Sequence, residues 1–127
     1  MDHAQLVDQD RLDGAALLRR LDEATFPVEA AFWWLDSESG KWSLILVTPL
    51  VETEGPREAY GQLTKLVLLG EPSLVDLERV TLVKPTHTLP QLLRVALRTG
   101  PTDIAGISFS RNTVNGVYIE DAFIYRL

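Results

Sequence analysis

Most of the polar groups that can take part in chemistry lie near the C-terminus of this chain. Residues 104–127 read IAGISFSRNTVNGVYIEDAFIYRL. The pair Asn115-Gly116 lies between two runs rich in β-forming residues, which predicts a two-residue hairpin turn. Counting back from that turn places Ser110 opposite Asp121, so a hydroxyl and a carboxylate should meet across two strands.

One face of the predicted hairpin combines small polar residues with an acid and two aromatic rings. Its members are Gly106, Ser108, Ser110, Asn112, Asp121, Phe123 and Tyr125. Asp121 can accept hydrogen bonds, while Ser110 and Asn112 can donate them, so this face can form a shallow recess for a ligand or for a partner's side chain. The alternative is plain packing of small residues beside large rings. A one-residue bulge would move these groups to opposite faces.

The segment Lys84-Pro85-Thr86-His87-Thr88 is a second candidate site. It precedes a predicted helix, whose unpaired amide groups would favour an anion such as a phosphate or a carboxylate. Lys84 would supply a cation and His87 an imidazole. The alternative is that Thr88 caps the helix and His87 lies in solvent.

No recognised catalytic motif accompanies these residues. His87, Asp121 and Ser110 can be combined into a His-Asp-Ser set, but the sequence contains no nucleophile elbow. Cysteine is absent, and the second histidine is His3, so the chain lacks the ligand spacing of a metal site. We therefore predict no catalytic residues, no metal site and no cofactor.

The spacing of apolar residues predicts one α+β domain over residues 1–127, with residues 1–7 frayed. The expected fold is a two-layer sandwich in which a mostly antiparallel five-stranded sheet carries three helices, in the order α-β-β-α-β-α-β-β. Helices are expected at 10–24, from 56 until Gly70 and at 89–99, and strands at 28–35, 41–48, 79–84 and on both sides of Asn115-Gly116.

Tryptophans on the sheet suggest an interface. Trp33 and Trp34 are adjacent, so a strand must direct them to opposite faces. If helices cover only one face, Trp33 and Trp42 can form an apolar patch on the other. Burial of such a patch contributes roughly 25 cal/mol per Å² of apolar area, which favours association with a partner. The alternative is a sheet with helices on both faces.

The charge distribution limits the partners. The chain has 18 acidic and 12 basic residues, and 15 of the acids but only 7 of the bases lie in residues 1–83. A net charge of −6 disfavours binding to nucleic acids, whose phosphates would repel it. A basic protein partner would be attracted, although solubility alone also explains an acidic surface.

These observations predict a small acidic protein that binds another protein and has no catalytic activity of its own. It can be an inhibitor or neutralising partner of a basic protein, or a homodimer that associates through a face of its sheet. The alternative is a binder of small anions or nucleotide-type ligands, or a hydrolase, that uses the C-terminal hairpin and the segment before the third helix. We expect a cytoplasmic location without membrane contact, because no signal peptide is recognisable and the longest strongly apolar run, Leu44–Val47, is too short to span a bilayer.

Overall fold

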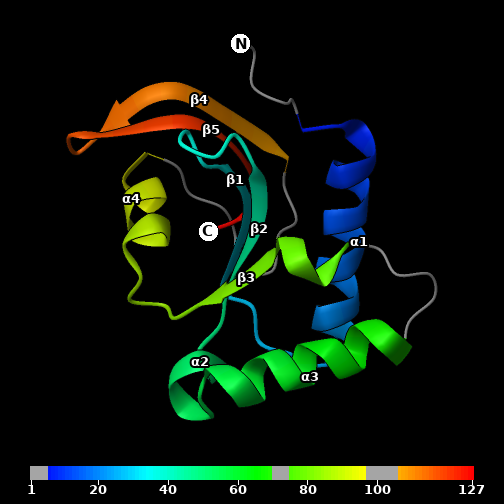
Figure 1. Cartoon of the computed structure of the whole chain (residues 1–127). Helices are drawn as coiled ribbons and strands as arrows, with labels where there is room; N and C mark the ends of the chain where they lie inside the picture. The colour runs from blue at the N-terminus through cyan, green and yellow to red at the C-terminus, as the bar shows by residue number, and fades with distance from the viewer. Residues whose placement is uncertain (1–5, 70–74, 97–105) are drawn as a thin grey trace.

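The chain forms one mixed sheet of five strands within residues 6–69, 75–96 and 106–127, the part that the computed structural model describes (Figure 1). The strands are β1 (Ala30–Leu35), β2 (Trp42–Val47), β3 (Val80–Val83), β4 (Ile107–Val114) and β5 (Val117–Arg126). Their order is β3-β2-β1-β5-β4, and each neighbouring pair is antiparallel except the parallel pair β2–β3. The predicted mostly antiparallel sheet is confirmed, and β2 lies in its interior between β3 and β1.

The helices lie on both sides of this sheet. In the described residues they are α1 (Asp8–Glu23), α2 (Leu50–Thr53), α3 (Pro56–Leu69) and α4 (Thr88–Ala96), with a 3-10 helix η1 at Leu77–Arg79. Figure 1 shows α1 and α3 on one side of the sheet and α4 on the other side, beneath the β4–β5 hairpin. The predicted α+β class and order of elements are confirmed, and the single-turn helix α2 is an addition to the three helices expected.

Helix α1 ends in a tight backbone motif. The amide of Phe26 donates to the Leu21 carbonyl at 2.9 Å, and the amide of Thr25 donates to the Asp22 carbonyl at 3.1 Å. These two bonds define a Schellman motif, which usually has glycine in the position that Thr25 occupies. Thr25 therefore has a positive φ of 59°, a left-handed conformation that is unfavourable for a β-branched residue. The motif directs the chain from α1 towards β1.

The sheet separates two apolar clusters. On the first side, residues of α1 and α3 pack against the sheet: Leu17, Leu18, Leu21, Ala59, Leu63 and Val67 against Ala31, Trp33, Leu44 and Leu46. On the second side, α4 packs against the sheet: Leu92 and Leu93 against Phe32, Ile45, Val47, Ile119 and Ile124. Both faces are thus covered at the centre of the sheet. The prediction of an open apolar face is wrong there, because α4 crosses the face that α1 and α3 leave uncovered.

The two edges of the sheet differ in how they are protected. At the β3 edge, the backbone amide of Leu82 donates to the hydroxyl of Tyr60 on α3 at 2.9 Å. At the other edge, β4 pairs only with β5 among the residues described. Its three members of the α4-side cluster, Ile107, Phe109 and Val114, are only partly buried. The β4–β5 hairpin is therefore the less enclosed end of the sheet.

Candidate functional site

The candidate site lies on the face of the β4–β5 hairpin that points away from α4. Register pairs Ser108 with Phe123, Ser110 with Asp121 and Thr113 with Tyr118. We call the side chains of these six residues the hairpin face. Residues that alternate with them, such as Phe109 and Ile119, pack in the cluster beside α4, and side chains alternate between the two faces of a strand. Figure 1 shows the outer surface of the hairpin, towards its tip, without a helix over it.

The hairpin turn has the conformation that its sequence predicts. Asn115 and Gly116 both have positive φ, of 50° and 78°, which is the signature of a type I′ turn. Val114 pairs with Val117 directly beside it. The predicted register, including the pair Ser110–Asp121, is therefore confirmed.

The strand alternation is interrupted in the middle of the hairpin. Arg111 has a positive φ of 51°. Ile119 and Ala122 lie three residues apart, yet both belong to the α4-side cluster, although strictly alternating strands would place them on opposite faces. The register puts Asn112 opposite Ile119, away from the Ser110–Asp121 pair. The side chain of Asn112 lies outside the described part of the structure, so its place in the predicted recess stays a prediction.

Asp121 is the chemically distinctive group of the hairpin face. Its carboxylate is partly buried, and this desolvation raises the pKa of Asp121 above its usual 3.8. The backbone amide of Ala122 and the positive charge of Arg11 act in the opposite direction. Arg11 reaches this face from α1, where its guanidinium lies 4.6 Å from the centre of the Phe123 ring. An incompletely solvated carboxylate beside the exposed Ser110 can accept a hydrogen bond from a partner.

Phe123 supports, for Gly106, the alternative that small residues of the hairpin simply pack beside large rings. A side chain at Gly106 would place its Cβ 3.1 Å from the tip of the Phe123 ring. The absence of a side chain at Gly106 therefore serves the packing of that ring, while the exposed Ser108 and Ser110 have no comparable role in the core.

Tyr125 belongs to the core and not to the candidate site. It is only 2% exposed. Its hydroxyl donates to the Arg11 carbonyl at 2.7 Å and accepts from Trp33 Nε1 at 3.0 Å. Helix α1 approaches so closely because Gly14 has no side chain to collide with this hydroxyl. The prediction that Tyr125 contacts a ligand is wrong, because α1 covers it.

The predicted tryptophan patch is also wrong. Trp33 is 0% exposed and Trp42 is 8% exposed, and both pack in the cluster beneath α1 and α3. Arg79 lies over the Trp33 ring, 4.6 Å from its centre, and is held there by two hydrogen bonds of 2.9 and 3.1 Å to Asp10 of α1. These tryptophans therefore stabilise the interior and are not available to a partner.

His87 has a structural role in the segment before α4. Its Nδ1 accepts a hydrogen bond of 3.1 Å from the backbone amide of Leu89, so His87 caps the helix. Thr88, the predicted cap, is instead the first residue of α4. Lys84 is exposed, and its carbonyl accepts from the His87 amide at 3.0 Å. Nothing in this segment beyond the exposed lysine favours the predicted anion.

The structure separates the groups of the hypothetical His-Asp-Ser set. His87 lies at the beginning of α4, on one side of the sheet, whereas Ser110 and Asp121 lie on the hairpin face that points away from α4. Among the residues described, no three histidines or acids come together in a way that could hold a metal ion. Within the same residues, no helix is long and apolar enough to cross a bilayer.

Two features that bear on function were not predicted from the sequence. Arg11 is 110 residues away from Asp121 in the chain, and no local pattern brings the two together. An open groove of about 340 Å³ lies between the end of α1 and α3, lined by Ala24, Thr25, Phe26, Gln62, Lys65 and Leu66. Its side chains come from two segments whose contact only the tertiary fold creates.

Comparison of the chain with models of protein families, with curated proteins and with solved structures gives no match.

Proposed function

We propose that this protein acts by binding another protein through the hairpin face, without chemistry of its own. The observation that carries this proposal is an outer sheet surface without a covering helix, which presents polar groups beside an exposed aromatic ring. Tyr118 is 54% exposed on this face, and Val117 at the tip is 43% exposed. Tyrosine is a frequent anchor of protein interfaces, because its rigid ring supplies contact area and its hydroxyl supplies a hydrogen bond.

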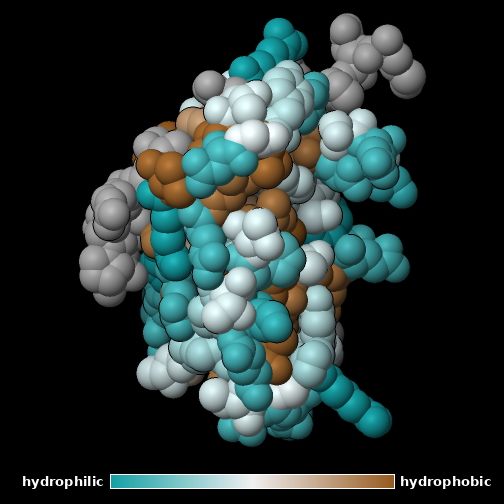
Figure 2. Space-filling model, turned by 90° about the vertical axis from the view of Figure 1, so that its left-hand side faces the viewer, coloured by the Kyte–Doolittle hydropathy of each residue, from teal (hydrophilic) through white to brown (hydrophobic). Residues whose placement is uncertain are grey.

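The surroundings of the hairpin are suited to a mixed polar and apolar interface. Figure 2 looks at the side of the molecule with α4 and the hairpin tip, and apolar areas reach the surface there between polar ones. Val95 on α4, which packs on the other side of the sheet from the hairpin face, is a further exposed apolar residue. Such alternation of apolar and polar surface is typical of interfaces that form between proteins that are also stable alone.

Asp121 gives the interface a preferred partner group. Folding removes part of the hydration of the Asp121 carboxylate. A hydrogen-bond donor from the partner would supply a contact in place of the water that is lost. The net charge of −6 accelerates the encounter with basic proteins over a longer range. A basic partner with a donor opposite Asp121 is therefore the best match.

Quantitative capture experiments test the proposal. Wild-type protein and the variants Tyr118→Ala and Ser110→Arg would be used to capture partners from a native lysate, with quantitative mass spectrometry as the readout. Ser37→Arg is the matched control, because Ser37 is also exposed but lies in the turn between β1 and β2. Partners retained by the wild type and by Ser37→Arg, but lost with both hairpin variants, would support the proposal. Equal partner sets for all four proteins would refute it.

Light scattering coupled to size exclusion distinguishes a second copy from a foreign partner. A mass of two copies that Ser110→Arg reduces to one would identify the partner as the chain itself. The variant Asp121→Asn separates an effect on partner binding from an effect on folding. Because burial raises the pKa of Asp121 and so disfavours its ionised form, the neutral amide should slightly increase the melting temperature while it weakens partner binding.

A further inference from the structure

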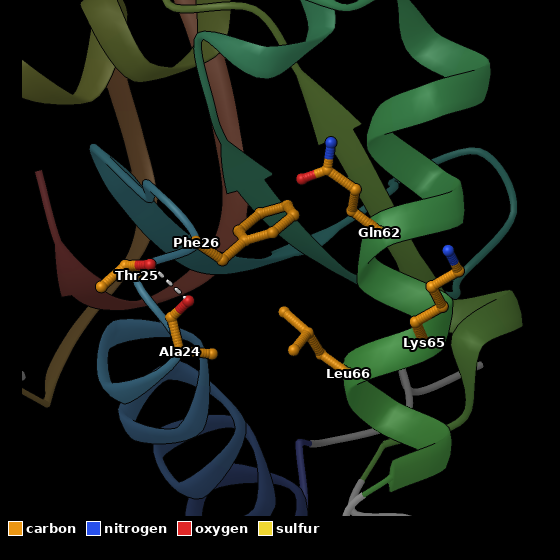
Figure 3. A pocket seen from close by; sticks show the side chains of 6 residues that line it. All are labelled: Ala24, Thr25, Phe26, Gln62, Lys65 and Leu66. Atoms are coloured by element: carbon orange, nitrogen blue, oxygen red, sulfur yellow. Dashed lines mark hydrogen bonds between the residues drawn. The ribbon is translucent and has the colours of Figure 1, made fainter.

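The groove between α1 and α3 is separate from the hairpin face. Figure 3 shows Gln62, Lys65 and Leu66 projecting from α3 on one side, and Phe26 from the segment after α1 on the other. Its volume of about 340 Å³ is at the small end of the range for ligand sites, about 300 to 1,000 Å³. Phe26 and Leu66 make an apolar wall, so a ligand needs an apolar part of a few carbon atoms.

The side chains that line the groove carry a net positive charge. Lys65 is its charged residue, and within the described part of the chain it forms no ion pair with a carboxylate. Gln62 also makes no side-chain hydrogen bond there. Among the residues described, Lys65 lacks such a pair although acids outnumber bases by about two to one in residues 1–83. Both groups donate hydrogen bonds, and one carries a positive charge, so they are complementary to a carboxylate.

The opposite side of the groove fixes the orientation of a ligand. Ala24 lies at the C-terminal end of α1, where helix carbonyls carry partial negative charge and repel anions. The Ala24 carbonyl already accepts the Thr25 hydroxyl at 2.6 Å, as the dashed line in Figure 3 marks. A carboxylate would therefore lie on the α3 side, with its apolar part directed towards Phe26.

The strained turn beside the groove is a second, independent feature. Thr25 keeps a positive φ of 59° at a position where glycine would avoid the strain. Retained strain of this kind is more common at functional sites than elsewhere. The Thr25 side chain lines the groove, which gives a reason for a side chain at this position.

We propose that this groove binds a small aliphatic carboxylate, with the anionic group at Lys65 and Gln62 and the hydrocarbon against Phe26 and Leu66. The site does not depend on the protein partner proposed above. It adds a small-molecule ligand to the protein partner that we propose for the hairpin face.

Titration of the full chain with hexanoate, followed by amide NMR shifts, tests this site. Saturable shifts are expected for residues 24–26 and 62–66, and hexylamine of equal length should not produce them. Lys65→Gln should weaken hexanoate binding about two- to five-fold, the range for an exposed ionic contact. Lys41→Gln removes the same charge from the exposed turn between β1 and β2 and should leave binding unchanged.

Three results would overturn the proposal. They are the absence of saturable shifts in these two segments, equal shifts with hexylamine, and equal weakening by Lys65→Gln and Lys41→Gln. Both lysines are exposed, so neither variant should unfold the protein, and circular dichroism would verify this.

Discussion

Arg126 in β5 binds Asp22 in the last turn of α1 through two hydrogen bonds of 3.0 and 2.7 Å. The Arg126 side chain is 2% exposed, and its guanidinium also donates to the Val28 carbonyl at 3.1 Å. One buried cation thus joins the final strand to the end of the first helix and to the segment that leads into β1. These elements are 98 to 104 residues apart in the chain.

Asp22→Ala should destabilise the protein, because it leaves the buried Arg126 without its carboxylate. Loss of one member of a buried pair costs several kcal/mol, and we expect about 2 to 4 kcal/mol here, since Asp22 is partly solvated. Urea denaturation would measure the free energy of unfolding. Glu23→Ala, at the exposed neighbouring position, should change it little. Equal effects of the two substitutions would show that Arg126 does not need Asp22.

Tyr60→Phe should weaken the β3 edge of the sheet. The substitution removes the hydroxyl that accepts from the Leu82 amide at 2.9 Å and leaves that amide without this acceptor. A loss of about 1 kcal/mol is expected. Tyr118→Phe provides the matched control, because Tyr118 is exposed on the hairpin and should tolerate the same change. Chemical denaturation of both variants distinguishes an edge contact from a general effect of the lost hydroxyl.

His87→Ala should destabilise α4 by about 1 kcal/mol, through loss of the acceptor for the Leu89 amide. His87→Asn should restore most of this stability, because asparagine is a good capping residue. Thermal unfolding of the three proteins gives the order wild type, Asn, Ala. If alanine and asparagine behave alike, capping is not the role of His87.

Thr25→Gly should stabilise the protein by about 0.5 to 1 kcal/mol. Glycine adopts positive φ without the steric cost of a β-branched side chain, although its unfolded state is more flexible. Thr25→Ala should gain less, since alanine keeps the unfavourable Cβ. Differential scanning calorimetry would report the change as a higher melting temperature for glycine. A lower one would mean that the threonine side chain contributes more to the fold than the strain costs.

Stability should decrease at alkaline pH because of Tyr125. Burial is the main cause that raises the pKa of Tyr125 to about 12 from its ordinary 10.0, and the hydrogen bond from Trp33 opposes it. Between these values the unfolded chain has lost the phenol proton and the folded protein has kept it. The contribution of Tyr125 to stability is therefore complete below about pH 10 and is lost as the pH rises towards 12.

Urea denaturation across this alkaline range would measure that decrease. Tyr125→Phe should be less stable at neutral pH, because the bonds to Arg11 and Trp33 are lost. It should also lose less stability between pH 10 and 12. The exposed Tyr118→Phe should follow the wild-type curve. A parallel curve for Tyr125→Phe would mean that another group causes the alkaline loss.

Part of the candidate site was predictable because it depends on local geometry. Asn115 and Gly116 adopt the positive φ values that their types favour, and this fixes the pairing of Ser110 with Asp121. The interruption of strand alternation at Arg111 was not predictable, because no residue type there signals a positive φ within the strand. Tyr125 and the tryptophans were misassigned because alternation along a strand identifies two faces but not which helix covers each.

The sequence by itself determined the α+β class, the order of the main elements and the hairpin turn. These follow from apolar periodicity and from the backbone preferences of glycine, proline and asparagine, which act over a few residues. The tertiary structure alone decided that α4 covers the second face, that Arg11 lies over the Phe123 ring of the hairpin face, and that an open groove forms between α1 and α3. Those arrangements depend on how amphipathic helices divide the two faces of one sheet between them, which is settled by packing between residues far apart in the chain.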